Sequence, residues 1–470
     1  MQSILVIDQG THASRAVLYS VMGELIDQVE SPIDLIRIGH ERVEQDPLQI
    51  LYSIQHAVAT LLARNRLPVG RTALATQRST VLAWDKNDGR PLSPALSWQD
   101  RRASDDLEQF KSKEAEIYQI TGLPLSPHYG AGKLRWLLRA NEDVQQASKN
   151  ESFCFGPLVS FLLHHLLSDA LHLVDHSNAH RTQLFNIATL SWSKPLLELF
   201  DIPSCYLPHL KPMQSEWGRL KEGAIPLTVV CGDQNAALFS QGEVPDDVAI
   251  VNLGTGAFIL KPVKSRVTNS RGLLQGIAKS EEGNCQYLLE GTVNGAGAAL
   301  TWAQQQWPVN GLYENLDDWL VQIQSPPLFI NTVSGLGSPW WSGGCAPYFI
   351  GPSDASTESK YVAIIESIVF LLQHNLEQLQ KTDRLTTLHV GGGLSKVDGL
   401  CQRLADLSGL QVVRFQELES TARGAAWLAM GCPKKWLKPA IEKTFAPANA
   451  GDLKKRYEQF SNEIRTVCNK

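Results

Sequence analysis

The chain has 470 residues, more than one hydrophobic core usually supports, so two domains of comparable size with an active site in the cleft between them are expected. Its composition, 43% hydrophobic and 19% charged, is ordinary for a globular protein. The formal net charge of -5 offers no general attraction for nucleic acid, so no nucleic-acid partner is expected.

The N-terminal residues MQSILVIDQG lack the basic end and long apolar segment of a secretory signal, and we expect the mature chain to begin here. Residues 4–7 form a buried strand, residues 8–11 a tight glycine turn, and residues 15–19 a second strand. Further along, residues 73–76 form a short strand that ends just before Gln77 and Arg78. The chain therefore opens with a hairpin, and a strand that ends in polar residues follows it.

Residues 157–171 are the most apolar helix candidate. The segment contains His164, His165 and Asp169 and is shorter than the roughly 20 residues that span a bilayer, so it predicts a core helix and no membrane insertion. His176 and His180 then have helical spacing, but HSNAH lacks the glutamate of a HExxH zinc site and is interpreted as a polar loop.

Residues 227–231 form an apolar strand, followed by a loop at 232–235 and the start of a helix at 236–239. Asp233 thus lies at the carboxyl end of a strand, where functional groups gather in α/β sheets. The polar, proline-containing segment 241–247 predicts a domain boundary, which gives an N-terminal domain of residues 1–243 and a C-terminal domain of residues 244–470. A helical tail is expected over residues 434–470.

A second hairpin opens the second half, with strands at 248–251 and 257–260 around the turn NLGTG. Glycine lets backbone N–H groups approach an anion, and threonine adds a hydroxyl donor, so both turns suit phosphate. One such turn by itself is more often only a tight hairpin, but its recurrence at the start of each half favours phosphate binding. No GxxxxGK[ST] or GxGxxG motif occurs, which disfavours a Walker-type NTPase and a Rossmann dehydrogenase.

Seven motifs in this order, DQGTHASRA, QRSTVLAWD, WQDRR, GDQNAALF, NLGTGAF, GLGSPWW and GGGLSKVDGL, resemble those of the FGGY family of carbohydrate kinases. The resemblance covers residues 1–432, and its details are most similar to the glycerol kinases of that family, including connecting segments such as RTQLFNIATLSW. It implies an α/β fold of two actin-like, ribonuclease H-like domains. It also implies transfer of the γ-phosphate of ATP, with Mg²⁺, to a hydroxyl of a small polyol or sugar.

The resemblance assigns Asp233 as the catalytic base, and Asp8 together with Asp233 as the groups that hold Mg²⁺. Phosphoryl transfer needs an oriented hydroxyl and a divalent ion on the phosphates, which two acids at facing turns can supply. A lone aspartate in such a turn would otherwise be a turn cap. The positions that match nucleotide-contacting residues of the family are Thr11, His12, Arg15, Gly254, Thr255, Gly256, Gly295, Gly297, Gly392 and Gly393.

For the acceptor, Arg78 and Gln234 match residues that contact hydroxyls, and Trp98 matches an aromatic wall. Two positions in this pocket depart from the glycerol kinases: Ser79 replaces a glutamate and His128 a tyrosine. Losing a carboxylate removes a strong acceptor of hydrogen bonds, so both changes bear on which polyol is bound. His12 replaces a second threonine, and residues 396–398 replace asparagines of the adenosine loop.

The motifs favour an ATP-dependent kinase for a glycerol-like acceptor, with a ketopentose or other sugar kinase as the alternative within the family. A non-catalytic, nucleotide-binding regulator on the same fold is the alternative outside the enzymes, and the presence of Asp233 argues against it. The eight cysteines contain no CxxC pair, which fits reduced thiols in the cytoplasm. The sequence is also compatible with a homo-oligomer.

Overall fold

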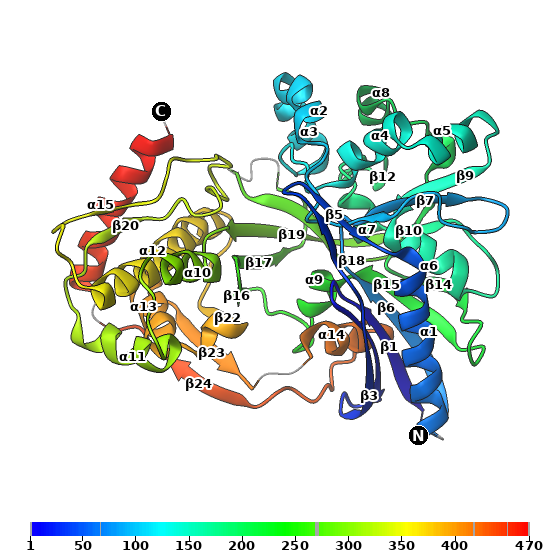
Figure 1. Cartoon of the computed structure of the whole chain (residues 1–470). Coiled ribbons are helices and arrows are strands. Elements are labelled where there is room, and N and C mark those ends of the chain that lie inside the picture. The colour runs from blue at the N-terminus through cyan, green and yellow to red at the C-terminus, as the bar shows by residue number, and fades with distance from the viewer. Residues whose placement is uncertain (1, 66, 268–271, 417–418, 449, 469–470) are drawn as a thin grey trace. The chain divides into compact units, whose positions relative to one another are not determined.

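The computed structural model describes residues 2–65, 67–267, 272–416, 419–448 and 450–468, and Figure 1 shows its elements. The chain forms two compact units. The first unit comprises Met1–Glu243, Gly276–Tyr287 and Leu418–Lys438, and the second comprises Val244–Gln275, Leu288–Glu417 and Pro439–Lys470. The chain thus passes between the units first at Glu243 and Val244, inside the predicted boundary segment, and two later segments return to the first unit.

The first unit is built on a six-stranded sheet with the order β14-β15-β6-β1-β2-β3. Its strands are β1 (Ser3–Gln9), β2 (Ala13–Ser20), β3 (Leu25–Pro32), β6 (Val69–Thr76), β14 (Gln214–Arg219) and β15 (Pro226–Gly232). β1 pairs antiparallel with β2 and parallel with β6, and β6 pairs parallel with β15. Every residue of β1 is buried, as its unbroken apolar run from Ile4 to Ile7 predicts for a central strand.

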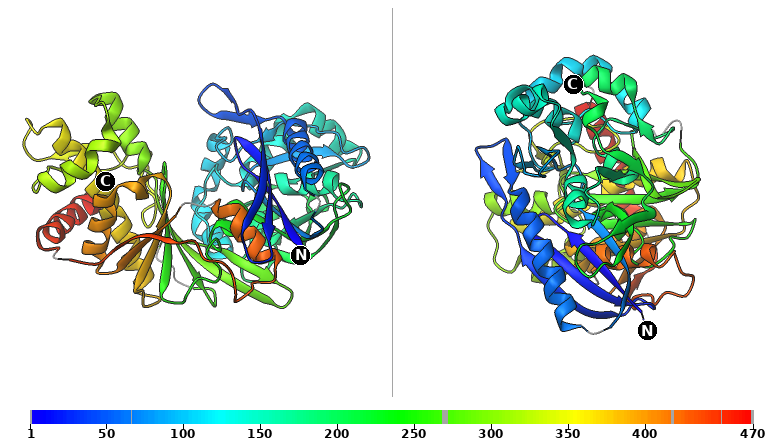
Figure 2. Two further views of the ribbon diagram at one scale, coloured as in Figure 1. Left: turned by 90° about the horizontal axis from the view of Figure 1, so that it is seen from below. Right: turned by 90° about the vertical axis from the view of Figure 1, so that its right-hand side faces the viewer.

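Two helices pack against this sheet. α1 (Pro47–Arg64) contacts β2 and β3 and runs beside these blue strands in the right-hand view of Figure 2. It begins at Asp46, whose side chain accepts a hydrogen bond from the N–H of Leu48, with proline at the first helical position. α14 (Ser420–Ala429) contacts β6, β1 and β15. The apolar residues of α1 and of β1, β2 and β6 form one continuous core.

A second, five-stranded sheet and several short elements complete the first unit. The sheet has the order β4-β5-β8-β7-β9, formed by β4 (Ile36–Ile38), β5 (Arg42–Gln45), β8 (Ala95–Leu96), β7 (Val81–Asp85) and β9 (Phe153–Pro157). The helices are α2 (Ser104–Leu107), α3 (Glu114–Thr121), α4 (Gly130–Ala140), α5 (Glu142–Lys149), α6 (Leu158–Leu166), α7 (His176–His180), α8 (Lys194–Phe200) and α9 (Asp233–Ala237), with 3-10 helices η1 (Glu108–Lys113) and η2 (Ser204–Tyr206). Short strand pairs are formed by β10 (Leu173–Asp175) with β13 (His209–Lys211) and by β11 (Phe185–Asn186) with β12 (Ser191–Trp192).

A seven-stranded sheet, on which the second unit is built, has the order β18-β19-β17-β16-β22-β23-β24. Its strands are β16 (Val248–Leu253), β17 (Ala257–Val263), β18 (Leu274–Glu281), β19 (Asn284–Val293), β22 (Thr387–Gly391), β23 (Gln411–Phe415) and β24 (Ile441–Phe445). β16 pairs antiparallel with β17 and parallel with β22, and β22 pairs parallel with β23. The same pairing of an opening hairpin with two parallel strands occurs in both sheets, so the repeat predicted from the two hairpins is confirmed.

The remaining helices and strands belong to the second unit. The helices are α10 (Gly297–Gln306), α11 (Leu312–Gln322), α12 (Thr357–Gln380), α13 (Asp398–Ser408) and α15 (Gly451–Cys468), with the 3-10 helix η3 (Gly393–Lys396) and the strand pair β20 (Leu328–Ile330) and β21 (Tyr348–Ile350). α12 is buried along most of its length. α15 is fixed to it by Arg456, whose guanidinium lies 2.5 Å from the carboxylate of Glu366.

Three local predictions need correction. The tail expected to be helical over residues 434–470 contains strand β24 before α15, because β23 offers residues 441–445 an antiparallel edge. The core helix expected over residues 157–171 is buried but ends at Leu166. Asp233 does not lie in a loop, because α9 follows β15 directly and Asp233 is the first residue of α9.

In the described part of the chain, none of the helices combines the length and apolarity needed to cross a membrane.

Candidate active site

Three parallel strands of the first unit end together. In the registers of β1, β6 and β15, Asp8 lies opposite Ala75, and Thr76 lies opposite both Gln9 and Gly232. Asp8 on β1 and Asp233 after β15 are therefore brought to the same edge of the sheet. Residues more than 200 positions apart in the sequence share this edge because parallel strands present their carboxyl ends on one side.

Asp8 is a buried carboxylic acid, with 6% of its surface exposed. Burial and, to a smaller extent, the negative charge of Asp233 raise its pKa to about 7, and Arg15 opposes the shift. The nearest guanidinium nitrogen of Arg15 is 3.9 Å from the Asp8 carboxylate. Without a further cation, ionised Asp8 is therefore electrostatically unfavourable at this position.

Asp233 is held by its neighbours in a fixed orientation. Its Oδ1 accepts the backbone N–H of Gln234 at 2.7 Å and lies 3.8 Å from Nε of Arg78. Burial raises the pKa of Asp233, while the positive charge of Arg78 lowers it. A carboxylate of raised pKa with a defined direction has the properties of a general base.

Arg78 is the main cation beside Asp233, and its side chain is 9% exposed. The guanidinium donates hydrogen bonds to the side-chain oxygens of Gln234 and, at 3.1 Å, of Asn235. Its path requires a glycine at Gly232, because a Cβ there would lie 2.4 Å from Cδ of Arg78. The sequence reasoning missed Gly232 and Asn235 as parts of the site, although both occur in the motif GDQN.

The segment HSNAH, residues 176–180, holds Gly232 in place by a hydrogen bond. Its interpretation as a polar loop was wrong. It forms the buried helix α7, which begins after Asp175 because that carboxylate accepts the backbone N–H groups of Ser177 and Asn178. The hydroxyl of Ser177 in turn accepts the N–H of Gly232 at 2.9 Å. The segment thus fixes the residue before Asp233 by hydrogen bonding.

The first phosphate turn, predicted at residues 8–11, lies between Gly10 and Ala13, because Asp8 and Gln9 still belong to β1. A 2.9 Å bond from the N–H of Gly10 to the oxygen of Ala13 closes it. The indole N–H of Trp98 donates to the hydroxyl of Thr11 at 3.0 Å. His12 is exposed. Arg15 contacts two further carboxylates, Glu30 at 2.5 Å and Glu419 at 3.2 Å, so it is largely neutralised by its own unit.

The predicted acceptor residues Trp98 and His128 are neighbours, with ring centroids 5.8 Å apart in an edge-to-face arrangement. Burial lowers the pKa of His128 well below its ordinary value, and the nearby charges of Lys133, Arg181, Arg78 and Arg101 lower it further, so the imidazole is neutral. Ser79 has a left-handed backbone, with φ of 65°, and its buried hydroxyl has no hydrogen-bond partner among the residues that the structure describes.

A chain of buried polar side chains links the first turn to Trp98, and the sequence reasoning missed it. Gln45 donates to the carbonyl of Thr11 at 2.8 Å, and Gln77 donates to Gln45 at 2.9 Å. The hydroxyl of Thr80 donates to Gln77 at 2.9 Å and accepts the backbone N–H of Trp98 at 3.1 Å. The motif QRST was a signal for two of these residues, but Gln45 had none.

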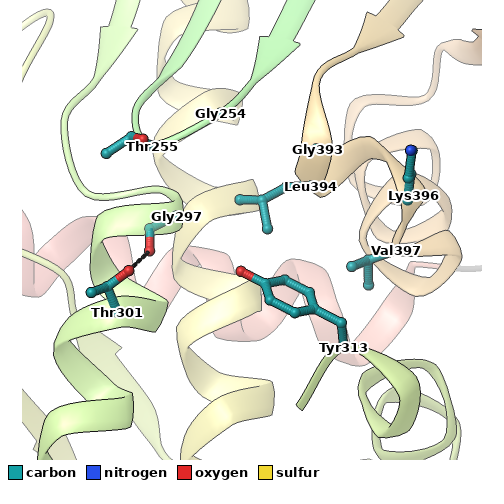
Figure 3. Close-up of a pocket in the computed structure, with 9 residues that line it drawn as sticks. All are labelled: Gly254, Thr255, Gly297, Thr301, Tyr313, Gly393, Leu394, Lys396 and Val397. Carbon is teal, nitrogen blue, oxygen red and sulfur yellow. Dashed lines mark hydrogen bonds between the residues drawn. The ribbon is translucent and has the colours of Figure 1, made fainter. Parts of the chain in front are cut away.

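The second unit contains a pocket of about 460 Å³ (Figure 3). Its lining residues are Gly254, Thr255, Gly297, Thr301, Tyr313, Gly393, Leu394, Lys396 and Val397. Four of them, Gly254, Thr255, Gly297 and Gly393, were predicted to contact the nucleotide. In Figure 3, the ring of Tyr313 and the side chain of Leu394 extend into the space enclosed by these residues.

The turn and helix α10 are joined by backbone contacts on the pocket wall. The N–H groups of Gly297 and Ala298 donate to the carbonyls of Gly254 and Thr255 at 3.0 and 2.9 Å. A Cβ on Gly297 would lie 2.8 Å from the Gly254 oxygen, so only glycine permits this approach.

The other predicted glycines, Gly256, Gly295 and Gly392, do not line the pocket but lie one or two positions along the chain from lining residues. Gly392 has φ of 88°, and a Cβ there would lie 2.5 Å from Oδ1 of Asn252. It directly precedes η3, whose residues form one side of the pocket. The sequence reasoning missed the contributions of Thr301 and Tyr313, which lie in none of the motifs. Leu394 and Val397 lie within the motif GGGLSKVDGL, but the sequence reasoning gave neither of them a contact with the nucleotide.

The donor set at the strand edge of the first unit fits Mg²⁺. Mg²⁺ usually takes one or two protein carboxylates and completes its coordination with water and phosphate oxygens. Asp8 and Asp233 supply two carboxylates, and the raised pKa of Asp8 shows that a cation would relieve its burial as an anion. Among the described residues no group of three or more His, Cys, Asp or Glu side chains could hold a metal by itself.

The fold and the two sets of residues define a two-domain α/β phosphotransferase, and comparison with known proteins agrees. The N-terminal domain model of the FGGY family of carbohydrate kinases matches residues 3–240, and the C-terminal domain model matches residues 249–431. The chain belongs to the FGGY family of carbohydrate kinases. It is an ATP-dependent kinase that acts on an alcohol group of a sugar or polyol.

Curated relatives extend over most of the chain. A glycerol kinase of Citrifermentans bemidjiense is 35% identical over 91% of this chain and 90% of its own length, and a glycerol kinase of Geobacter sp. is 34% identical over the same shares. Among solved structures, Plasmodium falciparum glycerol kinase with ADP has a TM-score of 0.90 at 24% identity, covering 99% of this chain and 98% of that one. Ligand-bound xylulose kinase from Lactobacillus acidophilus has a TM-score of 0.88 at 21% identity, with the same coverage. These structures confirm the predicted actin-like α/β fold.

Proposed function

We propose that this chain transfers the γ-phosphate of ATP to a hydroxyl of a small, neutral polyol, with Asp233 as the general base. The observation that carries the proposal is the convergence of Asp8, Asp233 and Arg78 at one strand edge of the first unit. Together they supply a base, a second carboxylate for a cation and a cationic neighbour that orients the base.

In the proposed reaction, the acceptor oxygen forms a bond to the γ-phosphorus while the bond from that phosphorus to the β,γ-bridging oxygen breaks. The hydroxyl proton passes to Asp233, and ADP leaves with the bridging oxygen. The hydrogen bond from the N–H of Gln234 holds the Asp233 carboxylate in place, and the positive charge of Arg78 favours its ionised form by opposing the effect of burial on its pKa.

Asp8 and Asp233 would hold Mg²⁺, which neutralises phosphate charge during transfer. The residues proposed to contact the nucleotide in the second unit are Gly254, Thr255, Gly297 and Gly393, with Gly256, Gly295 and Gly392 shaping the neighbouring backbone. Tyr313, Leu394 and Val397 add an apolar surface in the same pocket, which suits the flat base of the nucleotide. Thr11 and His12 belong to the turn of the first unit, and Arg15 belongs to strand β2 after it; Thr11 is proposed to approach the transferred phosphate.

A neutral polyol is the acceptor class that the first unit suits best. Trp98 offers an aromatic face, Ser79 an unpaired hydroxyl, and His128 an uncharged imidazole that can exchange hydrogen bonds with hydroxyls. Glycerol is the first candidate because the 35% and 34% identical relatives are glycerol kinases. A ketopentose is the second, because Ser79 is smaller than the glutamate that glycerol kinases carry there and leaves more volume.

We also place the protein in the cytoplasm. All eight cysteines are free of disulfides, and three of them, Cys154, Cys231 and Cys401, are buried thiols. Such thiols are typical of a reducing compartment.

The test is ADP formation from ATP, coupled to NADH oxidation, with a panel of glycerol, erythritol, xylitol, D-xylulose, D-ribulose and gluconate. We expect magnesium-dependent turnover that is fastest with glycerol. Faster turnover of a ketopentose would replace glycerol by the second candidate. Equal ADP formation by the wild type and by Asp233→Asn would rule out Asp233 as the base, and no acceptor-dependent ADP from the wild type would favour the non-catalytic regulator.

A further inference from the structure

Helix α4 contains a lysine that is completely buried. Lys133, the fourth residue of this helix, has 0% of its surface exposed. An ammonium group removed from water needs hydrogen-bond acceptors to offset the lost hydration, and a cation in the first turn also opposes the helix dipole. A lysine at this position is therefore expected to have strong compensating contacts.

Those contacts are three backbone carbonyls from three separate segments. The ammonium donates to the oxygen of Ser79 at 2.6 Å, of Ser97 at 3.0 Å and of His128 at 3.0 Å. An ammonium has three N–H donors, so this set of partners is complete. Asp100, from the same motif as Trp98, adds a favourable negative charge nearby.

The same three segments carry the proposed acceptor pocket. Ser79 and His128 are two of its residues, and Ser97 directly precedes the third, Trp98. Ser79 also has a left-handed backbone, which is strained for a residue with a side chain and persists only where neighbouring groups hold it. The bond from Lys133 to the Ser79 carbonyl is the shortest of the three and restrains that strained residue.

We infer that Lys133 is a positioning residue that sets the spacing of the three acceptor-binding segments and thereby the affinity for the acceptor. This inference rests on the proposed function. Lys133 contacts no reacting atom in it. Its effect is transmitted through Ser79, Trp98 and His128, so its loss should change acceptor binding and leave nucleotide binding unaltered.

Arg135 provides a matched control on the same helix. It is also buried, with 6% exposure, and its guanidinium donates to Asp106 at 2.8 Å and to the carbonyl of Phe200 at 3.0 Å. Neither partner belongs to the predicted pocket. Loss of Arg135 should therefore lower the stability of the same helix without changing acceptor affinity.

The experiment compares Lys133→Met and Arg135→Met with the wild type, using glycerol or whichever acceptor of the panel the wild type uses fastest. Met keeps an unbranched side chain as far as Cε and removes the ammonium group with its donors. We expect Lys133→Met to raise the acceptor KM at least tenfold while the ATP KM changes less than twofold. Arg135→Met should lower the melting temperature and keep both KM values within twofold of wild type.

An acceptor KM that is unchanged in folded Lys133→Met, or raised as much in Arg135→Met, overturns the inference. If Lys133→Met does not fold, Lys133→Gln carries the test, because it keeps two N–H donors without the charge. A threefold or larger rise in its acceptor KM supports the inference, and a smaller change overturns it. The proposed function fails separately, when the wild type itself gives no acceptor-dependent ADP.

Discussion

The two units present two different kinds of surface at equivalent places in equivalent sheets. At the strand ends of the first unit, charged and polar side chains dominate: Asp8, Arg15, Arg78 and Asp233 contact one another or their immediate neighbours. The pocket of the second unit is formed largely by glycine turns and apolar side chains, with Lys396 as its cationic lining residue.

This difference indicates a division of labour between the repeats. Side chains in the first unit can accept a proton, hold a cation and bind hydroxyls, all of which require specific functional groups. The pocket of the second unit is lined by glycine turns, a type of backbone that can bind phosphate oxygens without a titrating group. Removal of a side-chain functional group should therefore lower activity most in the first unit. Addition of a single carbon atom to a glycine should instead weaken nucleotide binding in the second unit.

The largest effect is expected at Asp233. Asp233→Asn removes the proton acceptor while keeping the shape, and should lower kcat by about 10²- to 10⁴-fold, with little change in the ATP KM. Steady-state ADP formation measures it. Asp201→Asn is the control, because Asp201 is 81% exposed and lies outside the site. A kcat for Asp233→Asn within a factor of three of wild type would mean that the first unit does not supply the base.

In the second unit, Gly392→Ala tests the role of backbone shape. The added Cβ would meet Asn252 and the carbonyl of Leu253 at 2.5 and 2.6 Å and displace η3. We expect the ATP KM to rise about tenfold, corresponding to ~1.4 kcal/mol. Gly409→Ala shares the positive φ, at 70°, but has open space around its Cβ, so it should cost stability without changing the ATP KM. Equal KM changes in both variants would contradict a local effect on the pocket.

A smaller, selective effect is expected from the residues that replace the family's usual acceptor contacts. His128→Tyr and Ser79→Glu should change the ratio of kcat/KM between glycerol and a ketopentose by about 3- to 30-fold, because each alters one hydrogen-bonding group in the pocket. Competition assays with paired acceptors measure this ratio. His12→Thr, at an exposed position of the phosphate turn, should leave it unchanged. If the ratio changes only in His12→Thr, acceptor selectivity is determined at the phosphate turn and not by Ser79 and His128.

The smallest effect concerns stability and pH. Burial lowers the pKa of Lys133 to about 7 from 10.5, so above pH 7 the folded chain progressively loses the ammonium proton that completes the three hydrogen bonds, while the unfolded chain keeps its proton up to about pH 10.5. The free energy of unfolding should therefore rise with pH in that window, by at most about 1.4 kcal/mol per unit from this group. Urea denaturation at pH 7, 8 and 9 should show a shallower rise in Lys133→Met. Equal slopes would indicate that Lys133 remains charged throughout.

The two hairpins, the internal repeat and the position of Asp233 could be predicted from the sequence itself. Apolar runs beside glycine turns predicted both hairpins and the repeat, because a central strand and a tight turn are local features. The position of Asp233 after a strand and the glycines of the second turn followed in the same way. The assignment of roles to these residues came from the family motifs and stays a prediction, to be decided by the variants above.

Tertiary structure alone decided the contacts that support those residues. Strand β24 pairs with the edge that β23 offers, and this pairing with a distant segment made residues 441–445 a strand instead of part of the predicted helix. The burial of α7 beneath Gly232, the link from Gln45 to Trp98, and the three carbonyls around Lys133 all join segments that are distant in sequence. Hydrogen bonds of this kind depend on which side chains the fold brings within about 3 Å, and no periodicity or motif of a single segment encodes that distance.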